Sequence, residues 1–380
     1  MKAIYFTEEH EAFRDQVRRF VDEEVRPHAD AWEEAGEIPR EVFRKMGELG
    51  FLGVRYEEDY GGAEMDTFGS IVLGEEMGRS GLGGFTASTM VHTDMASPHL
   101  QRYGTPEQKS QYMPDIIAGK TITAVGVTEP GAGSDVAGIT TRAEKRGNGW
   151  VLNGGKIYIT NGVLGDLFFI AARTDPDAKA SRGVSMFIVE KGTPGFHVAR
   201  KLDKMGWRCS DTAELVFEEV ELTADALLGE EGQGFYQIMD NFQNERLVMG
   251  AMVTGEAERA VEITADHVKT RQAFGGTLWD KQAVRLKLAD CATKIGANKA
   301  LVHHTAWMDA QGIDCVKEVS MIKVNAARMI QDVVWECVQL HGGSGYMRGM
   351  EIERMYRDAR VQAIGGGATE VMLEEVAKRI

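Results

Sequence analysis

The spacing of apolar residues predicts that the chain begins with amphipathic helices. Phe13, Val17, Phe20 and Val21 recur at helical spacing behind Thr7, whose hydroxyl group suits the N-terminal cap of a helix. Further helices are predicted over residues 40–50, 67–78 and 106–119. The first part of the chain is therefore predicted to be mostly helical.

Beyond Thr121 the pattern changes to the one typical of β-strands. Strands are predicted over residues 121–128, 140–146, 150–153, 167–173, 184–190 and 213–222. The turn Gly147-Asn148-Gly149 joins two of them as a hairpin. No segment of helix length separates these strands, so we expect a largely antiparallel sheet. The GxGxxG loop of a doubly wound dinucleotide fold is also missing after the first strand.

From about Gly232 the helical period returns and persists to the end of the chain. Helices are predicted over residues 235–269, 281–310, 317–340 and 369–379. Long helices joined by short loops predict an antiparallel bundle. The fold class is therefore a multidomain α+β protein. We place its domains at residues 1–120 (helical), 121–228 (β) and 229–380 (helical bundle).

Charge and cysteine content narrow the functional classes. Asp and Glu total 58 against 43 Lys and Arg, a formal charge of −15, and there is no basic block. Such a chain is a poor candidate for binding nucleic acid or an anionic membrane. The four cysteines lack CxxC spacing, which favours free thiols in a reducing compartment, and we expect no metal site. Residues 1–10 show no leader pattern, so we expect a cytoplasmic protein without an inserted membrane segment.

Two glycine- and polar-rich segments are candidates for contacting a ligand. The loop over residues 128–135 follows a predicted strand, and its glycines let the backbone approach a ligand closely. Taken alone, such a loop is more often a simple turn. Tyr158, in the segment 156–162, is either a platform for a flat ring or a core aromatic. Three further weak signals are the segments 271–275, 339–346 and 357–370.

In this order and spacing, these segments together resemble the acyl-CoA dehydrogenase family over essentially the whole chain. The resemblance implies an N-terminal helical domain, a middle β-barrel-like domain and a C-terminal four-helix bundle. It also implies FAD as cofactor, an electron-transferring flavoprotein as electron acceptor, and a homotetramer that holds FAD between subunits.

The resemblance assigns cofactor contacts residue by residue. The two flavin-binding stretches fall on Val125, Val127, Thr128, Gly133, Ser134, Tyr158 and Thr160. The arginine that reaches the pyrophosphate across a subunit boundary matches Arg271, accompanied by Phe274 and Gln282, while Gln339 and Gly343 match adenine-dinucleotide contacts. Ala368 and Glu370 lie where the C-terminal loop meets the flavin. Many members have Trp at Tyr158, a larger aromatic residue at Val125, and Thr at Ala368.

The same resemblance assigns substrate contacts to Ser134, Gln243, Arg246 and Gly367. Ser134 thereby serves both the flavin and the CoA side. Arg246 is expected to position either the base or the substrate.

The largest departure from the family concerns the catalytic base. Many members carry a glutamate at Gly366, and glycine cannot accept a proton. Glu245 lies within the apolar stripe formed by Phe242 and Met249, where a carboxylate is costly without a partner or a function. From the apolar stripe alone, the favoured interpretation is that Glu245 lies at the edge of the stripe and pairs with solvent or with an arginine.

Isovaleryl-CoA and long-chain acyl-CoA dehydrogenases, however, use a glutamate on this helix in a Glu-Arg-Leu context, and this chain reads Glu245-Arg246-Leu247. The tail 360–367 also resembles the long-chain and citronellyl-CoA branches. Glu245 is therefore the predicted base, with Glu370 as its rival.

These assignments predict FAD-dependent α,β-dehydrogenation of a long or branched acyl-CoA to the trans-2-enoyl-CoA. Glu245 removes the α-proton, the β-hydride passes to flavin N5, and the backbone N–H of Gly366 helps to stabilise the enolate oxygen. Two alternatives stay open. One is an acyl-CoA oxidase or flavin monooxygenase on the same fold, and the other is a non-catalytic acyl-CoA-binding protein, suggested by Gly366.

Overall fold

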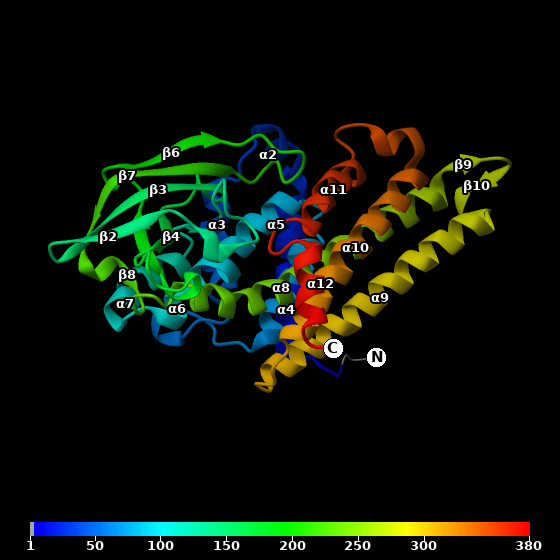
Figure 1. Cartoon of the computed structure of the whole chain (residues 1–380). Helices are drawn as coiled ribbons and strands as arrows, with labels where there is room; N and C mark the ends of the chain where they lie inside the picture. Colours follow the sequence, from blue (N-terminus) through cyan, green and yellow to red (C-terminus); the bar gives the residue numbers. More distant parts are fainter. Residues whose placement is uncertain (1–3) are drawn as a thin grey trace.

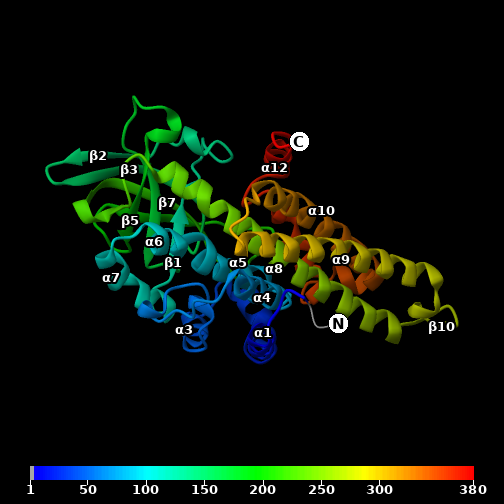
Figure 2. The same ribbon diagram turned by 90° about the horizontal axis from the view of Figure 1, so that it is seen from below.

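The computed structural model describes residues 4–380. Residues 1–3, which belong to the segment 1–10 in which we expected no leader sequence, lie outside the described residues. Figure 1 shows a β-sheet at one end, long helices at the other, and N-terminal helices packed between and beneath them. The view from below in Figure 2 places α4 and α5 centrally, between the sheet and the long helices.

The N-terminal helices are built around α4, all of whose residues are buried. Helix α1 begins after Thr7, whose hydroxyl group caps it as the sequence predicted, and His10 completes a capping box that was not predicted. Helices α2, α5 and α6 were not predicted. Helix α5 is buried on every side and therefore lacks an amphipathic period. The bounds are α1 Glu8–Phe20, α2 Ala29–Ala35, α3 Arg40–Glu48, α4 Thr67–Gly78, α5 Gly83–Met90, η5 Val91–Ala96, α6 Ser97–Tyr103 and α7 Pro106–Ile117.

The middle region is one eight-stranded sheet in the order β6-β7-β3-β2-β4-β5-β8, with β1 pairing to β4. Most pairs are antiparallel, as predicted, although β1 and β2 each pair with β4 in parallel. Strand β6 was not predicted, because after Phe196 its side chains are all exposed and do not alternate between apolar and polar. The bounds are β1 Thr123–Gly126, β2 Arg142–Arg146, β3 Gly149–Thr160, β4 Leu167–Arg173, β5 Val184–Glu190, β6 Phe196–Lys201, β7 Thr212–Leu222 and β8 Leu227–Leu228.

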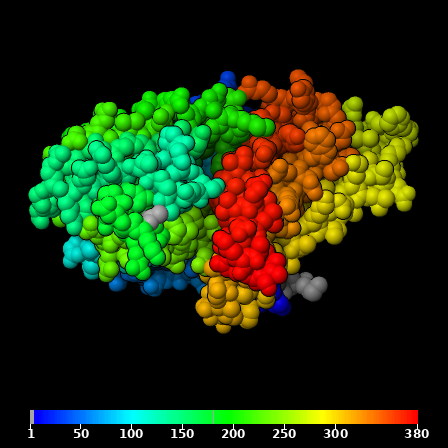
Figure 3. Space-filling model, viewed as in Figure 1, coloured from blue at the N-terminus to red at the C-terminus, as the bar shows by residue number. Residues whose placement is uncertain are grey.

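The C-terminal region consists of long helices and a small hairpin. Helices α8, α9, α10 and α12 agree with the predicted ranges, whereas α11 was not predicted. Figure 3 shows α12, in red, lying along the surface between the strands and the long helices. The bounds are α8 Gly234–Thr270, β9 Gln272–Ala273, β10 Gly276–Thr277, α9 Gln282–Ala310, α10 Val316–His341, α11 Glu351–Ala359 and α12 Thr369–Ala377.

Several composition-based expectations can be compared with this structure. All four cysteines are buried free thiols. Over residues 4–380, no helix is long and apolar enough to cross a membrane. In the same range, no three His, Cys, Asp or Glu side chains gather as metal ligands would.

Helices α4 and α8 pack backbone against backbone, and this contact positions the central part of α8. A Cβ atom on Gly255 would overlap the carbonyl oxygen of Glu75, and one on Gly78 would overlap that of Met252. Only glycine permits such an approach, since neither carbonyl belongs to a flexible side chain.

We therefore expect Gly255→Ala to lower the thermal denaturation midpoint by about 1–4 °C, because overpacking costs about 1–3 kcal/mol and exceeds the gain in helix propensity. The matched control is Gly296→Ala in α9, where an added Cβ meets no atom within 4 Å. That variant should keep or slightly raise the midpoint. Equal midpoints for the two variants would contradict the close packing.

Candidate active site

Glu245 lies in the first half of α8 and is only 6% exposed. Among residues 4–380, no side chain or backbone donor forms a hydrogen bond with its carboxylate. The alternative in which Glu245 lies at the edge of the stripe and pairs with an arginine therefore does not describe its surroundings. An unpaired buried carboxylate is costly, which marks the place as a candidate functional site.

The C-terminal loop meets this carboxylate at Gly366. A Cβ atom on Gly366 would lie 3.1 Å from Glu245 Oε1 and 2.7 Å from Met249 Sδ. Gly366 also has a φ of +66°, a conformation that favours glycine. Arg246 Nε lies 3.5 Å from the Gly366 carbonyl oxygen. The structure thus brings Glu245, Arg246 and Gly366 together, as the sequence predicted, and a side chain at Gly366 would compete with Glu245 for space.

Burial dominates the electrostatics of this carboxylate. Loss of solvent raises the pKa of Glu245 from 4.5 to about 7, although the charges of Arg246 and Lys323 oppose the rise. Burial likewise lowers the pKa of Lys323 to about 8, and its ammonium group donates to the Gln362 carbonyl oxygen. Glu245 is therefore poised to exchange a proton near neutral pH.

The two predicted flavin stretches lie side by side. The amide of Ile157 donates to the Thr128 carbonyl oxygen at 2.9 Å, which joins the loop after β1 to strand β3. Beneath the loop, the buried Glu129 carboxylate pairs with Lys156 Nζ at 2.7 Å and accepts from the Thr140 amide at 2.6 Å. Neither Glu129 nor Lys156 was singled out from the sequence. An acidic residue at the start of a glycine-rich loop could have indicated a buried ion pair there.

The surface of these stretches can accommodate a flat ligand. Tyr158 is 66% exposed with a φ of +62°, so it is a surface residue and not a core aromatic. No atom within 4 Å would meet a Cβ on Gly131 or Gly133, so the loop has open space beside it. Ser134 is exposed, while Val125 and Val127 are half-buried against the same core as Phe242. Thr160 ends β3 and is also half-buried.

The predicted dinucleotide residues form a second group at the other end of the molecule. Arg271, Phe274 and Gln282 lie at the β9–β10 hairpin and the start of α9, far from the sheet in Figure 1. His267 and His341 stack with ring centroids 4.2 Å apart, which brings the ends of α8 and α10 together. The exposed side chain of Gln339 and the exposed Gly343 therefore belong to this group.

The two groups are separated by the length of α8. Arg271 follows Glu245 by 26 residues (271 − 245), or about 40 Å along a helix. One dinucleotide cannot reach both groups within a single chain. The structure therefore assembles the predicted cofactor residues into two separate half-sites.

The remaining predicted residues lie in the C-terminal loop, at the start of α12, or on α8. Gly367 has a φ of +108°, and a Cβ on it would lie 3.5 Å from Arg246 Nη2. Gln243 is half-buried on α8 and Ala368 is half-buried just before α12. Glu370, the rival base, is exposed in the first turn of α12.

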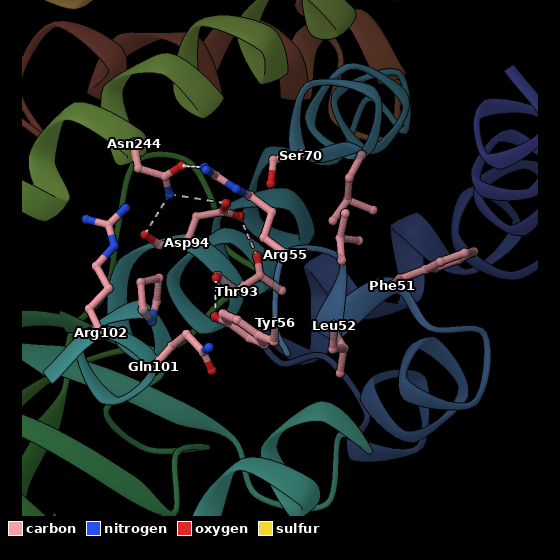
Figure 4. A pocket seen from close by; sticks show the side chains of 13 residues that line it. Phe51, Leu52, Arg55, Tyr56, Ser70, Thr93, Asp94, Gln101, Arg102 and Asn244 are labelled. Carbon is pink, nitrogen blue, oxygen red and sulfur yellow. Dashed lines mark hydrogen bonds between the residues drawn. The ribbon is translucent and has the colours of Figure 1, made fainter. Parts of the chain in front are cut away.

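A polar network around Asn244, the residue before Glu245, was not anticipated from the sequence; Figure 4 shows Asn244 with Arg55 and Asp94. Arg55 Nη1 donates to Asn244 Oδ1 at 2.6 Å. Asn241 Nδ2 donates to the carbonyl oxygens of Asp94 and Met95 at 3.0 and 3.1 Å. These carbonyls belong to η5, a π-helical segment whose wide turn shifts carbonyls from their usual partners. The sequence feature that could have indicated this network is the presence of Asn241 and Asn244 within the apolar stripe of α8, because buried amides need hydrogen-bond partners.

Comparison with known proteins supports the interpretation of the whole chain. The family models for the N-terminal, middle and C-terminal domains of acyl-CoA dehydrogenase match residues 7–120, 124–220 and 232–380. The mitochondrial long-chain specific acyl-CoA dehydrogenase of Mus musculus is 44% identical over 382 residues, covering 99% of this chain and 87% of that protein.

Solved structures agree in fold. An acyl-CoA dehydrogenase from Geobacillus kaustophilus superposes with a TM-score of 0.96 at 43% identity, covering 100% of this chain and 99% of the other. Butyryl-CoA dehydrogenase from Megasphaera elsdenii gives 0.95 at 32% identity, covering 98% of each chain. A complex of PigA with FAD gives 0.94 at 26% identity, again covering 98% of each.

The resemblance and the fold class drawn from the sequence are thus confirmed, while the domain limits at residues 120 and 228 stay a prediction. Helical, sheet and helical regions follow one another as that family requires, and three family models cover most of the chain. The chain belongs to the acyl-CoA dehydrogenase family of oxidoreductases.

Proposed function

We propose that the protein is an FAD-dependent dehydrogenase that converts a long or branched acyl-CoA to the trans-2-enoyl-CoA, with Glu245 as its base. The observation that carries the proposal is the buried Glu245 carboxylate packed against Gly366. Identity of 44% to a long-chain specific relative supports the choice of a long acyl chain. The butyryl-CoA dehydrogenase among the structural relatives represents the short-chain alternative.

Proton abstraction from a thioester needs a base and a donor for the developing enolate oxygen, because the α-proton is only weakly acidic. Glu245 is the proposed base, and its pKa of about 7 suits this task. The backbone N–H of Gly366 meets no acceptor within residues 4–380, so it is the proposed donor to the thioester oxygen. Arg246, Gln243, Gly367 and Ser134 are the proposed contacts to the rest of the acyl-CoA.

FAD is the proposed cofactor, and acceptance of the β-hydride is the chemistry that it supplies when bound. The flavin would lie against Tyr158 and the open loop at Gly133, beside Val125, Val127, Thr128, Ser134 and Thr160, with Ala368 and Glu370 at its C-terminal edge. Exposure of Tyr158 and open space at Gly133 fit a flat ring. The binding of FAD by a structural relative also supports this choice.

A homotetramer is the proposed assembly, with FAD shared between subunits. The half-site at Arg271, Phe274, Gln282, Gln339 and Gly343 is about 40 Å from Glu245, so a second copy of the chain is needed to complete each cofactor site. Phe274 is 92% exposed, and Trp335 and Tyr346 are exposed as well, which favours a protein interface.

The proposed electron acceptor is an electron-transferring flavoprotein, and the proposed setting is fatty-acid β-oxidation in the cytoplasm. Four buried free thiols suit a reducing compartment. The acceptor proposal rests on the family resemblance. Rapid oxygen consumption during turnover would instead favour an oxidase or a flavin monooxygenase on the same fold.

We expect Glu245→Gln to slow anaerobic bleaching of the flavin by palmitoyl-CoA by about 100-fold or more, since the amide cannot accept a proton. The variant should still bind the ligand. Glu256→Gln is the matched control, because Glu256 is another buried glutamate of α8, and it should bleach like the wild type.

Equal bleaching by the wild type and Glu245→Gln would place the base elsewhere, with Glu370 next to be tested. Bleaching by butyryl-CoA or hexanoyl-CoA alone would contradict the long-chain assignment. Failure of the wild type across long, branched and short thioesters would favour a non-catalytic acyl-CoA-binding protein.

The rate of bleaching should also depend on pH in one direction. Glu245 must be ionised to act as a base, and its pKa is about 7 in the enzyme. The rate should therefore rise with pH through about 7 and fall about tenfold per pH unit well below that value. Stopped-flow absorbance between about pH 5.5 and 8.5 measures this profile. A flat profile would contradict the role of Glu245.

Removal of the Glu245 charge should stabilise the fold at high pH. The folded pKa of about 7 exceeds the ordinary value of 4.5, so wild-type stability falls relative to Glu245→Gln as pH rises between these values. At 1.36 kcal/mol per pKa unit, the difference reaches roughly 3 kcal/mol above pH 7. Thermal denaturation midpoints of wild type and variant at about pH 5 and pH 8 test this. The control is Glu374→Gln at an exposed position, whose difference in midpoint from the wild type should be the same at the two pH values.

A further inference from the structure

We propose that the buried ion pair between Glu129 and Lys156 positions the flavin, because it fixes both flavin-binding stretches and directs one backbone donor toward the ring. The inference rests on the proposed role of FAD as cofactor and adds the residues beneath the site that order it. The side chains of Glu129 and Lys156 are 4% and 0% exposed. They act from below the site, so they are positioning residues and not cofactor contacts.

The Glu129 carboxylate closes the loop that carries Gly133 and Ser134. Its Oε2 atom accepts hydrogen bonds from the amide and the hydroxyl group of Thr140, at 2.6 and 2.8 Å, and its Oε1 atom accepts one from the Thr141 amide at 3.0 Å. These donors lie 11 and 12 residues further along the chain. One side chain thus joins the start of the glycine-rich loop to its end.

Lys156 connects this closed loop to the second flavin-binding stretch. Its Nζ atom donates to Glu129 Oε1 at 2.7 Å, from a position in β3 two residues before Tyr158. Beside it, the Ile157 amide donates to the Thr128 carbonyl oxygen at 2.9 Å. The loop after β1 and strand β3 are therefore held at one separation, and with them the residues proposed to contact the flavin.

A second hydrogen bond from Lys156 sets the direction of a backbone donor. Its Nζ atom also donates to the Val127 carbonyl oxygen at 3.1 Å, so this carbonyl group points toward the buried ammonium group. Residues 4–380 contain no cis peptide bond, and in a trans peptide the following N–H points the opposite way. The Thr128 N–H is therefore directed away from Lys156. Among the described residues it has no hydrogen-bond acceptor, and Thr128 is half-buried, so this donor is available to a ligand.

The charges of this pair serve orientation more than stability. Two apolar side chains of similar size would fill the same volume without the loss of hydration that a buried ion pair suffers. They could not, however, orient the Val127 carbonyl group or bind the Thr140 amide. Although burial opposes it, the charge of Lys156 lowers the pKa of Glu129 to about 2, so the carboxylate is ionised at neutral pH. A charged and directional contact is therefore present beneath the loop at the pH at which the enzyme would work.

Loss of the Lys156 ammonium group should weaken the binding of FAD and change its electronic properties. The peptide between Val127 and Thr128 could then rotate, so its N–H would no longer be held in one direction. A loop that becomes ordered only on binding also lowers affinity, because its conformational entropy is lost at that step. The reduced flavin ring carries more negative charge than the oxidised ring, so loss of a donor should make the reduction potential more negative.

The test compares wild-type holoenzyme with Lys156→Met and with the double variant Glu129→Gln/Lys156→Met. Serial dilution gives the dissociation constant of FAD from the fluorescence of released cofactor, and titration against a reference dye gives the reduction potential of bound flavin. In the two variants FAD should bind about tenfold more weakly, the loss expected for one hydrogen bond, and its potential should be more negative. The double variant contains no unpaired buried charge, so it keeps the test decisive if Lys156→Met does not fold.

Two controls separate positioning of the flavin from a general loss of stability. Lys145→Met removes the lysine of an exposed ion pair on the same sheet, in which Lys145 Nζ lies 2.6 Å from Glu231 Oε2. This variant should change neither the dissociation constant nor the potential. Gly255→Ala lowers stability through the contact of α4 with α8, far from the loop, and should likewise leave both values unchanged.

Wild-type affinity and potential in the two Lys156 variants would overturn the inference. Recovery of both values in the double variant alone would also overturn it, because the ion pair would then only balance its own charges. Weaker binding with an unchanged potential would show that no donor at the ring was lost, and would overturn it too. A wild-type protein that binds no FAD would instead contradict the proposed cofactor, so the two proposals fail in distinguishable ways.

Discussion

The candidate site depends on a steric constraint: a carboxylate from α8 and the backbone of the C-terminal loop share one small volume. Gly366 can approach Glu245 Oε1 because it has no side chain. The loop in turn removes solvent from the carboxylate and raises its pKa to about 7. The backbone of Gly366 keeps an unpaired N–H at the same place, so one residue both excludes water and offers a donor. The reactivity proposed for Glu245 thus arises from the absence of a neighbouring side chain.

Two different kinds of contact along one face of α8 fix its position relative to that loop. Gly78 and Gly255 allow the backbone of α8 to lie directly on α4. About three to four turns before Gly255, Asn244 and Asn241 bind carbonyl oxygens of the π-helical η5. Close packing fixes the separation of the helices, and the directional amide bonds fix their rotation. Together they determine where the Glu245 carboxylate points.

The sequence predicted those elements whose own residues reveal their surroundings. Helices α4 and α8 and strands β4 and β5 appear as periodic or continuous apolar segments, and the structure confirms them. Helix α5 was not predicted because its eight residues Gly83–Met90 include two glycines and several small polar residues, which hide a helical pattern, and β6 because its side chains face solvent.

The site was predictable to the extent that it matches a family pattern. Glu245, Arg246 and Gly366 were paired on the resemblance, and the structure brings them together, although their roles stay predictions. The polar network around Asn244 could not be predicted from the sequence. Arg55 and Asn244 are 189 residues apart along the chain, and each alone is an ordinary polar residue. Only the tertiary structure shows that they meet, because neither local periodicity nor spacing encodes a contact of that range.

The uninterrupted course of α8 has a consequence for how this chain can vary. One rigid helix of 37 residues carries the Glu245 carboxylate near one end and leads directly into Arg271 at the other. Inserting a single residue between them would rotate one end relative to the other by about 100° and lengthen the rod by about 1.5 Å. Substitutions along α8 can be absorbed locally, but a change in its length would disturb both ends at once. A change in the length of α8 should therefore disturb the fold more than a change in the length of a loop.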